Sequence, residues 1–173
     1  MRTRGFTLIE LLVVIAIIGI LSAVVITSLN SSRAKARDAQ RKAELTEIQK
    51  ALELYANDYG HYPCENASLC SGQSKNANGK IGEGSGLDTL LAPYMQAIPH
   101  DPLGPGNAAY YYYYDGQQNC TKDGAFRTIA VIFAYSLETP SSGNASDFCD
   151  TWGGEGGAGN ANGWYVVIGS SPT

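Results

Sequence analysis

A long run of apolar residues near the N-terminus dominates the hydrophobic pattern of the chain. From Leu11 to Ser32 there are 22 residues without a charge, rich in Leu, Ile and Val. As a helix this run reaches about 33 Å, enough to cross the roughly 30 Å hydrocarbon core of a membrane. An ordinary secretory signal peptide is disfavoured because its apolar region is only about 7 to 15 residues long. In addition, Leu21 occupies a position before the candidate cut at Ser22-Ala23 where a small residue is needed. The pattern therefore predicts a membrane-spanning helix.

After Ser32 the apolar pattern changes, but the predicted helix continues. Apolar residues recur at steps of three and four positions and form one stripe: Leu45, Ile48, Leu52, Tyr55 and Tyr59, with Ala51 and Ala56 beside them. Charged residues are expected on the opposite face, and among them Asp38 with Lys42 and Glu47 with Lys50 have helical ion-pair spacing. The others on this face are Arg41, Glu44 and Glu53. No Pro or Gly interrupts positions 20–59, so one helix is predicted from about Thr7 to Tyr59.

Beyond Gly60 the pattern predicts turns and short strands. The candidate strands are aromatic or β-branched runs at 108–114, 127–137 and 164–168, bounded by Asp115-Gly116, Asp123-Gly124 and Gly169. Residues 65–86 have the composition of a polar loop, and 87–95 that of a short helix or an extended connector. Such strands packed on one helix suffice for a small α+β core. Because side chains alternate along a strand, about half of Tyr110–Tyr114 is expected to face the helix. The others would meet solvent or a partner.

Composition and charge narrow the class of protein. The 173 residues are 44% hydrophobic and 16% charged, with a formal net charge of −4. These values disfavour a disordered chain, a collagen-like chain and a basic nucleic-acid binder. Charge is segregated, because the basic cluster at 33–42 has net charge +4 whereas 59–173 holds four basic against ten acidic residues. Two explanations stay open: a solvated helix face near lipid head groups, or salt-dependent cohesion with acidic heads of neighbouring copies.

Glu10 is the one acidic residue at the edge of the apolar run. A carboxylate there is costly unless it lies at the membrane interface or finds a positive partner. The dipole at a helix N-terminus favours an acidic residue and is one explanation. The other is cleavage after Gly5, which would free the amine of Phe6 one helical turn away, to neutralise Glu10 within the chain or across chains.

The segment Gly5-Phe6-Thr7-Leu8-Ile9-Glu10, between a short basic leader and an apolar helix, resembles the processing motif of type IV pilins and type II secretion pseudopilins. The resemblance implies cleavage after Gly5 by a prepilin peptidase and methylation of the Phe6 amine. It also implies that Glu10 neutralises the Phe6 amine of a neighbouring subunit during filament assembly. Gly19 falls where the family has a helix glycine. Many members carry a helix-breaking proline further along, where this chain has Val25-Ile26-Thr27-Ser28.

A second resemblance involves the segments Ala51 to Pro63 and Leu91 to Pro102, which are similar to the helix exit and central loop of major secretion pseudopilins and related simple pilins. Together the two resemblances imply a pilin fold, an α+β class in which a long N-terminal helix packs on a small antiparallel sheet. The expected division is a leader at 1–5, a transmembrane and assembly helix at 6–32 and a head at 33–173. The head includes the amphipathic half of the helix.

Membrane orientation has two conflicting signals. Arg2 and Arg4 precede the apolar run and the basic cluster follows it, so positive-inside counting favours a cytoplasmic head. The family pattern keeps the leader cytoplasmic and exports the head, and we expect this orientation. The chain is then a single-pass precursor in the bacterial inner membrane before it reaches an extracellular filament or the cell envelope.

Four cysteines in an exported head suggest two disulfides, with three connectivities open. We favour Cys64–Cys70 and Cys120–Cys149. Zinc is disfavoured because the spacing contains no CxxC pair and no nearby histidine completes a ligand set.

Candidate chemistry is sparse elsewhere. His61 and His100 each lie in a turn near a proline and have no triad partners, and no nucleophile elbow or phosphate loop is present, so we expect no enzyme. The resemblance makes calcium a candidate ligand through loop carboxylates, the weak candidates being Asp115, Asp123, Asp147 and Asp150. No other cofactor and no specific nucleic acid is expected.

The function expected from these residues is structural. The first hypothesis is a prepilin that polymerises through its apolar helix into a type IV pilus-like filament, with itself, a prepilin peptidase and a membrane platform with its assembly ATPase as partners. The alternative is a major-type pseudopilin of a type II secretion system. From another class, a single-pass exported binding or enzymatic protein remains.

Overall fold

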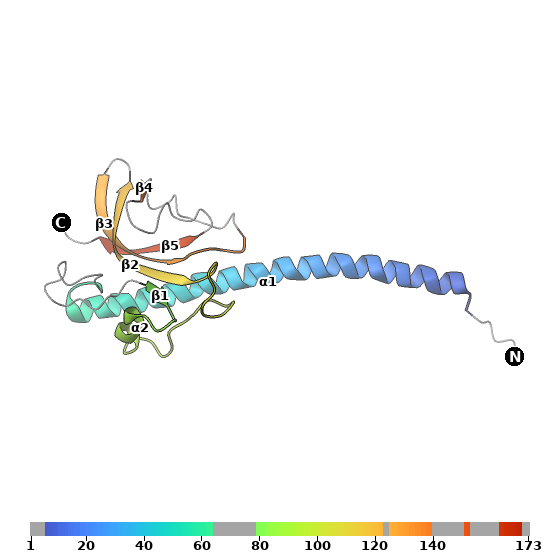
Figure 1. The fold of residues 1–173 in the computed structure, drawn as a ribbon, viewed down its shortest axis with the longest axis horizontal. Helices are drawn as coiled ribbons and strands as arrows, with labels where there is room; N and C mark the ends of the chain where they lie inside the picture. Colours follow the sequence, from blue (N-terminus) through green and yellow to red (C-terminus); the bar gives the residue numbers. More distant parts are fainter. Residues whose placement is uncertain (1–5, 64–78, 123–124, 140–150, 153–162, 171–173) are drawn as a thin grey trace. The chain divides into compact units, whose positions relative to one another are not determined.

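One long helix and a small antiparallel sheet make up the fold. The computed structural model describes residues 6–63, 79–122, 125–139, 151–152 and 163–170 (Figure 1). The helix α1 covers Leu8–Tyr59, which confirms the predicted continuous helix. The chain divides into two compact units, Met1–Ala36 and Arg37–Thr173, and the second unit is the head. The unit boundary falls inside α1, four residues beyond the end of the uncharged run.

In the head, the sheet packs on the second part of α1. Its strands are β1 (Gly79–Ile81), β2 (Tyr112–Lys122), β3 (Ala125–Ala134), β4 (Thr151–Trp152) and β5 (Trp164–Ser170). The order along the sheet is β1-β2-β3-β5, all neighbours are antiparallel, and β4 pairs with the far end of β2. The short helix α2 (Gly86–Leu91) follows β1, and its N-terminus is closed by a capping box between Ser85 and Asp88.

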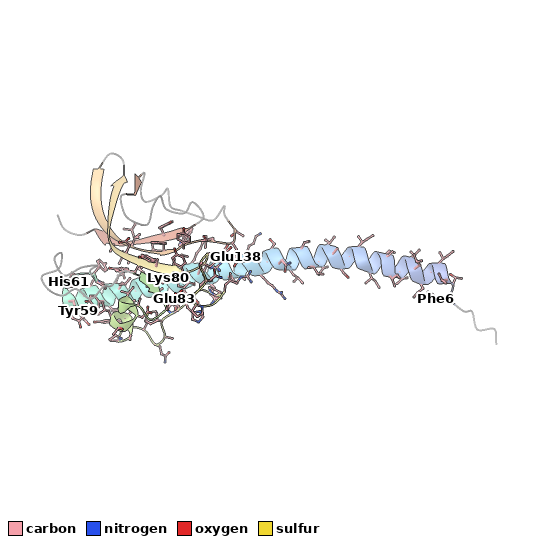
Figure 2. The ribbon with its side chains drawn as sticks, in the orientation of Figure 1. Phe6, Tyr59, His61, Lys80, Glu83 and Glu138 are labelled. Atoms are coloured by element: carbon pink, nitrogen blue, oxygen red, sulfur yellow. The ribbon has the colours of Figure 1, made fainter. Side chains whose placement is uncertain are left out.

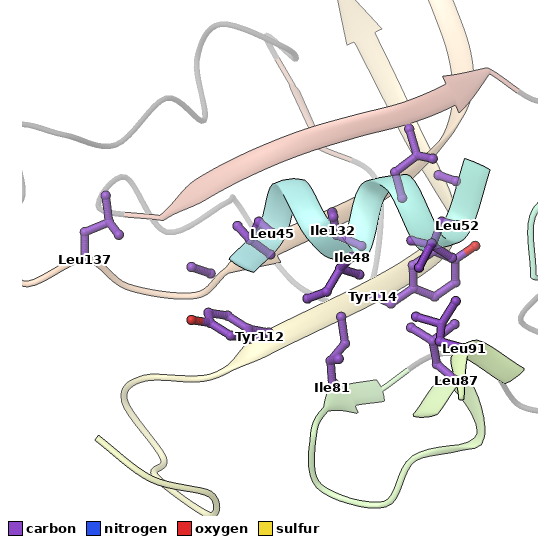
Figure 3. Packing of buried hydrophobic residues seen from close by; sticks show 14 residues of the cluster. Leu45, Ile48, Leu52, Ile81, Leu87, Leu91, Tyr112, Tyr114, Ile132 and Leu137 are labelled. Atoms are coloured by element: carbon purple, nitrogen blue, oxygen red, sulfur yellow. The ribbon is translucent and has the colours of Figure 1, made fainter. Parts of the chain in front are cut away.

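The apolar core lies between α1, the sheet and α2. Leu45, Ile48 and Leu52 of α1 are fully buried, and Figure 3 shows them packed among Ile81, Leu87, Leu91, Tyr112, Tyr114 and Ile132. These helix residues belong to the predicted stripe, so the periodicity located the buried face of α1 correctly. Tyr59 is the exception, because it is 54% exposed and stacks on Tyr55 with ring centroids 4.4 Å apart.

The tyrosine run alternates as the pleat of a strand requires. Tyr112 and Tyr114 are fully buried toward α1, and their hydroxyls donate hydrogen bonds to Glu44 and to the carbonyl of Pro63. Tyr111 and Tyr113 belong to the other face of the sheet, where they stack with Tyr135 and Phe133. The prediction that about half of the tyrosines pack on the helix is confirmed.

The strand boundaries differ from those predicted. Asp115-Gly116 does not end β2; the strand continues through it with a register shift between Asp115 and Gln118. A glycine is needed there because a Cβ at Gly116 would lie 2.8 Å from the carbonyl oxygen of Pro63. In β5, Gly169 likewise lies inside the strand, next to a second register shift. The segment 65–86, predicted as a polar loop, contains β1. This strand has only three residues and no apolar alternation, so the sequence pattern did not indicate it.

Candidate functional site

The N-terminus of α1 carries a reciprocal cap built from Thr7 and Glu10. The Thr7 backbone N–H and hydroxyl both donate to Oε2 of Glu10, at 2.8 and 2.6 Å, and the Glu10 N–H donates to the Thr7 hydroxyl at 3.3 Å. This is a capping box, which satisfies free N–H groups at a helix start. Its sequence signal is a threonine three residues before a glutamate at the start of an apolar run.

Among the residues that the structure describes, no cation pairs with the carboxylate of Glu10. The hydrogen bonds from Thr7 come from neutral groups, and Glu10 is exposed at the helix tip. Figure 2 places Phe6 directly beside this tip. Gly5 lies outside the described residues, so its predicted role in processing stays a prediction, as do the roles of Phe6 and Glu10 in assembly.

The first part of α1 presents apolar side chains on every side (Figure 2). It belongs to the one helix within the described ranges that is long and apolar enough to cross a membrane. Two of its hydroxyls bond within the helix, since Thr27 donates to the Val24 carbonyl and Ser32 to that of Ser28. A Cβ built at Gly19 would meet nothing within 4 Å. Packing within the described chain therefore does not explain this glycine.

In the head, a buried group of charged side chains surrounds Arg41. Arg41 is fully buried, and its guanidinium donates to both oxygens of Asp101, at 2.7 and 3.0 Å. It also donates to Asp38 at 2.7 Å and to Glu138 at 3.0 Å. The face of Tyr110 lies 4.8 Å from the guanidinium carbon. We call Arg37, Asp38, Arg41, Asp101 and Glu138 the Arg41 cluster.

The rest of the Arg41 cluster joins α1 to the chain beyond β3. Arg37 donates to the two oxygens of Glu138 at 2.7 and 2.5 Å, and Figure 2 shows Glu138 beside α1. Asp38 accepts the backbone N–H groups of Glu138 and Thr139, both at 2.9 Å, and the Thr139 hydroxyl. Helix side chains thus satisfy backbone donors that follow the last paired residue of β3.

Local sequence explains how Asp101 reaches Arg41. Residues 101–104 form a turn closed by a hydrogen bond from Gly104 N–H to the Asp101 carbonyl, 2.8 Å long, with Pro102 at its second position. Proline there also holds Asp101 extended. The same carboxylate accepts the Leu103 N–H at 2.9 Å, which fixes its orientation toward α1.

The electrostatics of the Arg41 cluster favour the charged forms. Burial alone would lower the pKa of Arg41, but hydrogen bonds to Asp101, Glu138 and Asp38 outweigh burial and raise it. The hydrogen bond from Arg37 lowers the pKa of Glu138. Burial opposes ionisation of Asp38, yet the donors of Thr139, Glu138 and Arg41 lower its pKa as well. The cluster holds three acidic and two basic groups, so it has a net charge of −1.

The structure corrects the predicted charged face of α1. Asp38 and Arg41 are buried rather than exposed, and Asp38 pairs with Arg41 instead of Lys42. Lys42 lies 3.8 Å above the ring of Trp164. Since Arg37 is also bound to Glu138, only Arg33 and Lys35 of the basic cluster remain exposed on the helix. These two residues are therefore the most accessible basic side chains of this cluster.

The structure describes only some of the residues predicted as calcium ligands or disulfide partners. Asp115 is buried on β2, whereas Asp123, Asp147 and Asp150 lie outside the described residues. Within the described ranges no three His, Cys, Asp or Glu side chains gather as metal ligands. The predicted pairs Cys64–Cys70 and Cys120–Cys149 also fall outside, because only the backbone of Cys120 is described. His61 and His100 each contact a backbone carbonyl of the next residue.

Comparisons with known proteins match the N-terminal segment and the following part of the chain to two different family models. Residues 1–26 match the family model of the prokaryotic N-terminal methylation motif. Residues 28–123, more than half of the chain, match the model of type II secretion system protein G. No solved structure matches.

Three curated relatives illustrate the similarity. The type II secretion system core protein G of Escherichia coli (strain K12) is 33% identical over 108 residues, which cover 60% of this chain and 68% of that protein. The corresponding protein of Klebsiella pneumoniae is 31% identical over 103 residues, or 60% of this chain and 71% of the relative. The type IV wide pilus major component PilA4 of Thermus thermophilus is 47% identical over 70 residues, or 40% of this chain and 53% of that protein.

These matches join the two features that the structure sets apart, a methylation-type N-terminus on an apolar helix and a head in which that helix packs on a small antiparallel sheet. With more than half of its length matched, and two thirds of the Escherichia coli relative covered at 33% identity, the chain belongs to the type II secretion system protein G family.

Proposed function

We propose that this chain is a prepilin whose mature form polymerises through α1 into a type IV pilus-like extracellular filament. The observation that carries the proposal is the first part of α1, which exposes apolar side chains on all sides and ends in a carboxylate capped by the neutral donors of Thr7. In a membrane, lipid covers this surface. In a filament, helices of neighbouring subunits replace the lipid, and the polymer carries the function.

The cap at Glu10 supports a specific assembly step. Thr7 holds the carboxylate at the helix tip by two neutral donors, which leaves its charge available to a cation. Cleavage after Gly5 creates such a cation at the Phe6 amine. The Phe6 amine of a neighbouring subunit carries a full positive charge, so it would add to its hydrogen bond with Glu10 an ion-pair attraction that the neutral donors of Thr7 lack.

Processing and location follow from the same proposal. A prepilin peptidase removes residues 1–5 and the new Phe6 amine is methylated. The subunit waits in the bacterial inner membrane through residues 6–32, with the head at 33–173 exported. A membrane platform with an assembly ATPase then extracts it into the filament.

A second candidate function is a major pseudopilin of a type II secretion machine, which uses the same helix chemistry to move cargo from the envelope. It is supported by the family of the chain and by its Escherichia coli relative, whereas PilA4 supports the pilus. Electron microscopy of sheared surface material separates the two. Long external filaments that contain this chain support a pilus, and their absence supports secretion.

N-terminal analysis tests the processing step. Mass spectrometry of the mature protein should find methylated Phe6 as the first residue, and Gly5→Leu should leave a full-length membrane form. Unprocessed Met1 on functioning molecules would instead support a single-pass exported binding or enzymatic protein.

Substitution of the carboxylate tests the assembly step. Glu10→Val should insert normally and polymerise poorly because the Phe6 amine of its neighbour loses its partner. Glu47→Val is the matched control, since it removes an exposed carboxylate from the same helix within the head. Equal filament yields from both variants would contradict the role of Glu10.

A further inference from the structure

The Arg41 cluster stands where α1 enters the head. Asp38 and Arg41 are the first buried residues along the helix, and the apolar contacts of Leu45, Ile48 and Leu52 follow them. Tension applied to the N-terminal part of the chain therefore reaches the cluster before it reaches the core. Chain connectivity alone fixes this order.

The contacts of the cluster are directional, whereas Leu45, Ile48 and Leu52 of α1 contact the core only through apolar side chains. Arg41 binds Asp101 through two parallel hydrogen bonds, and Arg37 binds Glu138 in the same way. Such pairs weaken steeply with distance and misalignment. Apolar burial depends on contact area, so it resists a small axial displacement weakly. The cluster thus opposes sliding of α1 along the head more strongly than the apolar stripe does.

A gain in equilibrium stability does not explain why the head buries the Arg41 cluster. Proteins in which well-packed apolar residues replace a buried ion-pair group are often as stable as the parent or more stable, because charged groups lose their hydration when they are buried. What apolar residues do not supply is a fixed register between three segments, here the helix at 37–41, the turn at 101–104 and the residues 138–139 after β3.

We propose that the Arg41 cluster is the mechanical joint of the subunit: it fixes the register of α1 on the head and transmits axial tension from the helix to the head. Arg41 is its positioning residue. The inference rests on the proposed function, in which extraction from the membrane pulls the subunit by its helix. A joint at the entry point keeps the head folded while that force acts.

Single-molecule pulling tests the joint. The full-length chain, solubilised in detergent, is held by peptide tags at its two ends and stretched. Arg41→Met is compared with Leu52→Ala, which removes a buried core contact further along α1. Chemical denaturation without force shows how much each substitution lowers equilibrium stability.

The two variants should unfold at clearly different rates under force. If the cluster breaks first, its loss lowers the rupture barrier, and the rate of unfolding under load rises about 100-fold in Arg41→Met. The contacts of Leu52 are still intact at that barrier, so Leu52→Ala should change the same rate by less than about 3-fold. Rates that rise in proportion to the equilibrium loss in both variants would overturn the proposal, since the cluster would then be one stabilising contact among others.

A milder variant covers the case in which Arg41→Met does not fold. Glu138→Gln keeps the size of the side chain and a carbonyl acceptor while it removes one charge shared by Arg37 and Arg41. It should raise the rate under load more than Leu52→Ala does, and a smaller effect than that of Leu52→Ala would also overturn the joint. Parent cells that form no filament or pseudopilus would refute the proposed function instead, and the rupture rates would still decide the joint.

Discussion

Arg41 and Asp101 are 60 positions apart in the chain and meet in a fully buried, two-point hydrogen bond of 2.7 and 3.0 Å. The pair joins α1 to the turn at 101–104.

The head should lose stability in acid. The pKa values of Glu138 and Asp38 are lower in the folded head than in the unfolded chain. As the pH falls, the unfolded chain therefore binds more protons than the folded head does, and the equilibrium shifts toward unfolding. Their contribution is complete above the unfolded values near pH 4 to 4.5 and is lost progressively below them. Urea unfolding followed by tryptophan fluorescence should show constant stability above about pH 5 and a decline below about pH 4. Glu138→Gln should flatten the decline, and the exposed control Glu47→Gln should not.

Gly82 should tolerate no side chain, in contrast with Gly84. Both have a positive φ, +79° and +82°, but a Cβ at Gly82 would lie 2.4 Å from the carbonyl oxygen of Pro99, whereas one at Gly84 meets nothing within 4 Å. Gly84→Ala should cost about 1 to 2 kcal/mol from backbone strain. Gly82→Ala should cost about 1 to 3 kcal/mol more because of overpacking. Equal losses in thermal or urea unfolding would contradict the close approach.

Charge removal at two neighbouring sites should have different effects. A variant with Arg33→Gln and Lys35→Gln removes the exposed basic side chains and should leave the head as stable as the parent, while its filaments fall apart at lower salt. Arg37→Gln removes a partner of Glu138 and should destabilise the head. Urea unfolding and filament recovery across a salt series measure the two effects. If Arg33 and Lys35 only contact lipid head groups, their removal leaves salt resistance unchanged.

Side-chain size at Gly19 should control assembly rather than folding. Nothing in the described chain fills the space beside this glycine, and an interior Gly makes a helix about 1 kcal/mol less stable than Ala does. We expect filament yield to fall from Gly to Gly19→Ala to Gly19→Leu while membrane insertion stays constant, because a neighbouring helix approaches there. Equal yields along the series, measured by sedimentation of sheared filaments, would exclude a close approach.

Periodicity predicted the elements that bury an apolar face. The stripe of α1 and the alternation of Tyr112 and Tyr114 are local signals, since a helix and a strand each impose a fixed spacing on the residues they bury. The start of the helix was predicted to within one residue from a different signal, the uncharged apolar run, while Tyr59, at the end of the stripe, is exposed.

The Arg41 cluster was not predicted, because its partners come from distant parts of the chain. Asp38 and Arg41 were placed on the solvent face from their charge alone. Their spacing gave a signal, since Arg41 is four positions before Leu45 and seven before Ile48, in line with the buried stripe. Which carboxylates would meet Arg41 depends on the tertiary positions of Asp101 and Glu138, and no local pattern encodes these.

The alternating tyrosines of β2 also restrict how the chain length can vary during evolution. Tyr112 and Tyr114 point inward with hydroxyl acceptors at Glu44 and Pro63, so inserting or deleting one residue within the paired run 112–115 would move the residues beyond it to the opposite face of the sheet. Compensation would require new acceptors and a new pairing with β1 and β3 at once. Insertions and deletions in homologous chains should therefore avoid 112–115 and accumulate where no register depends on them.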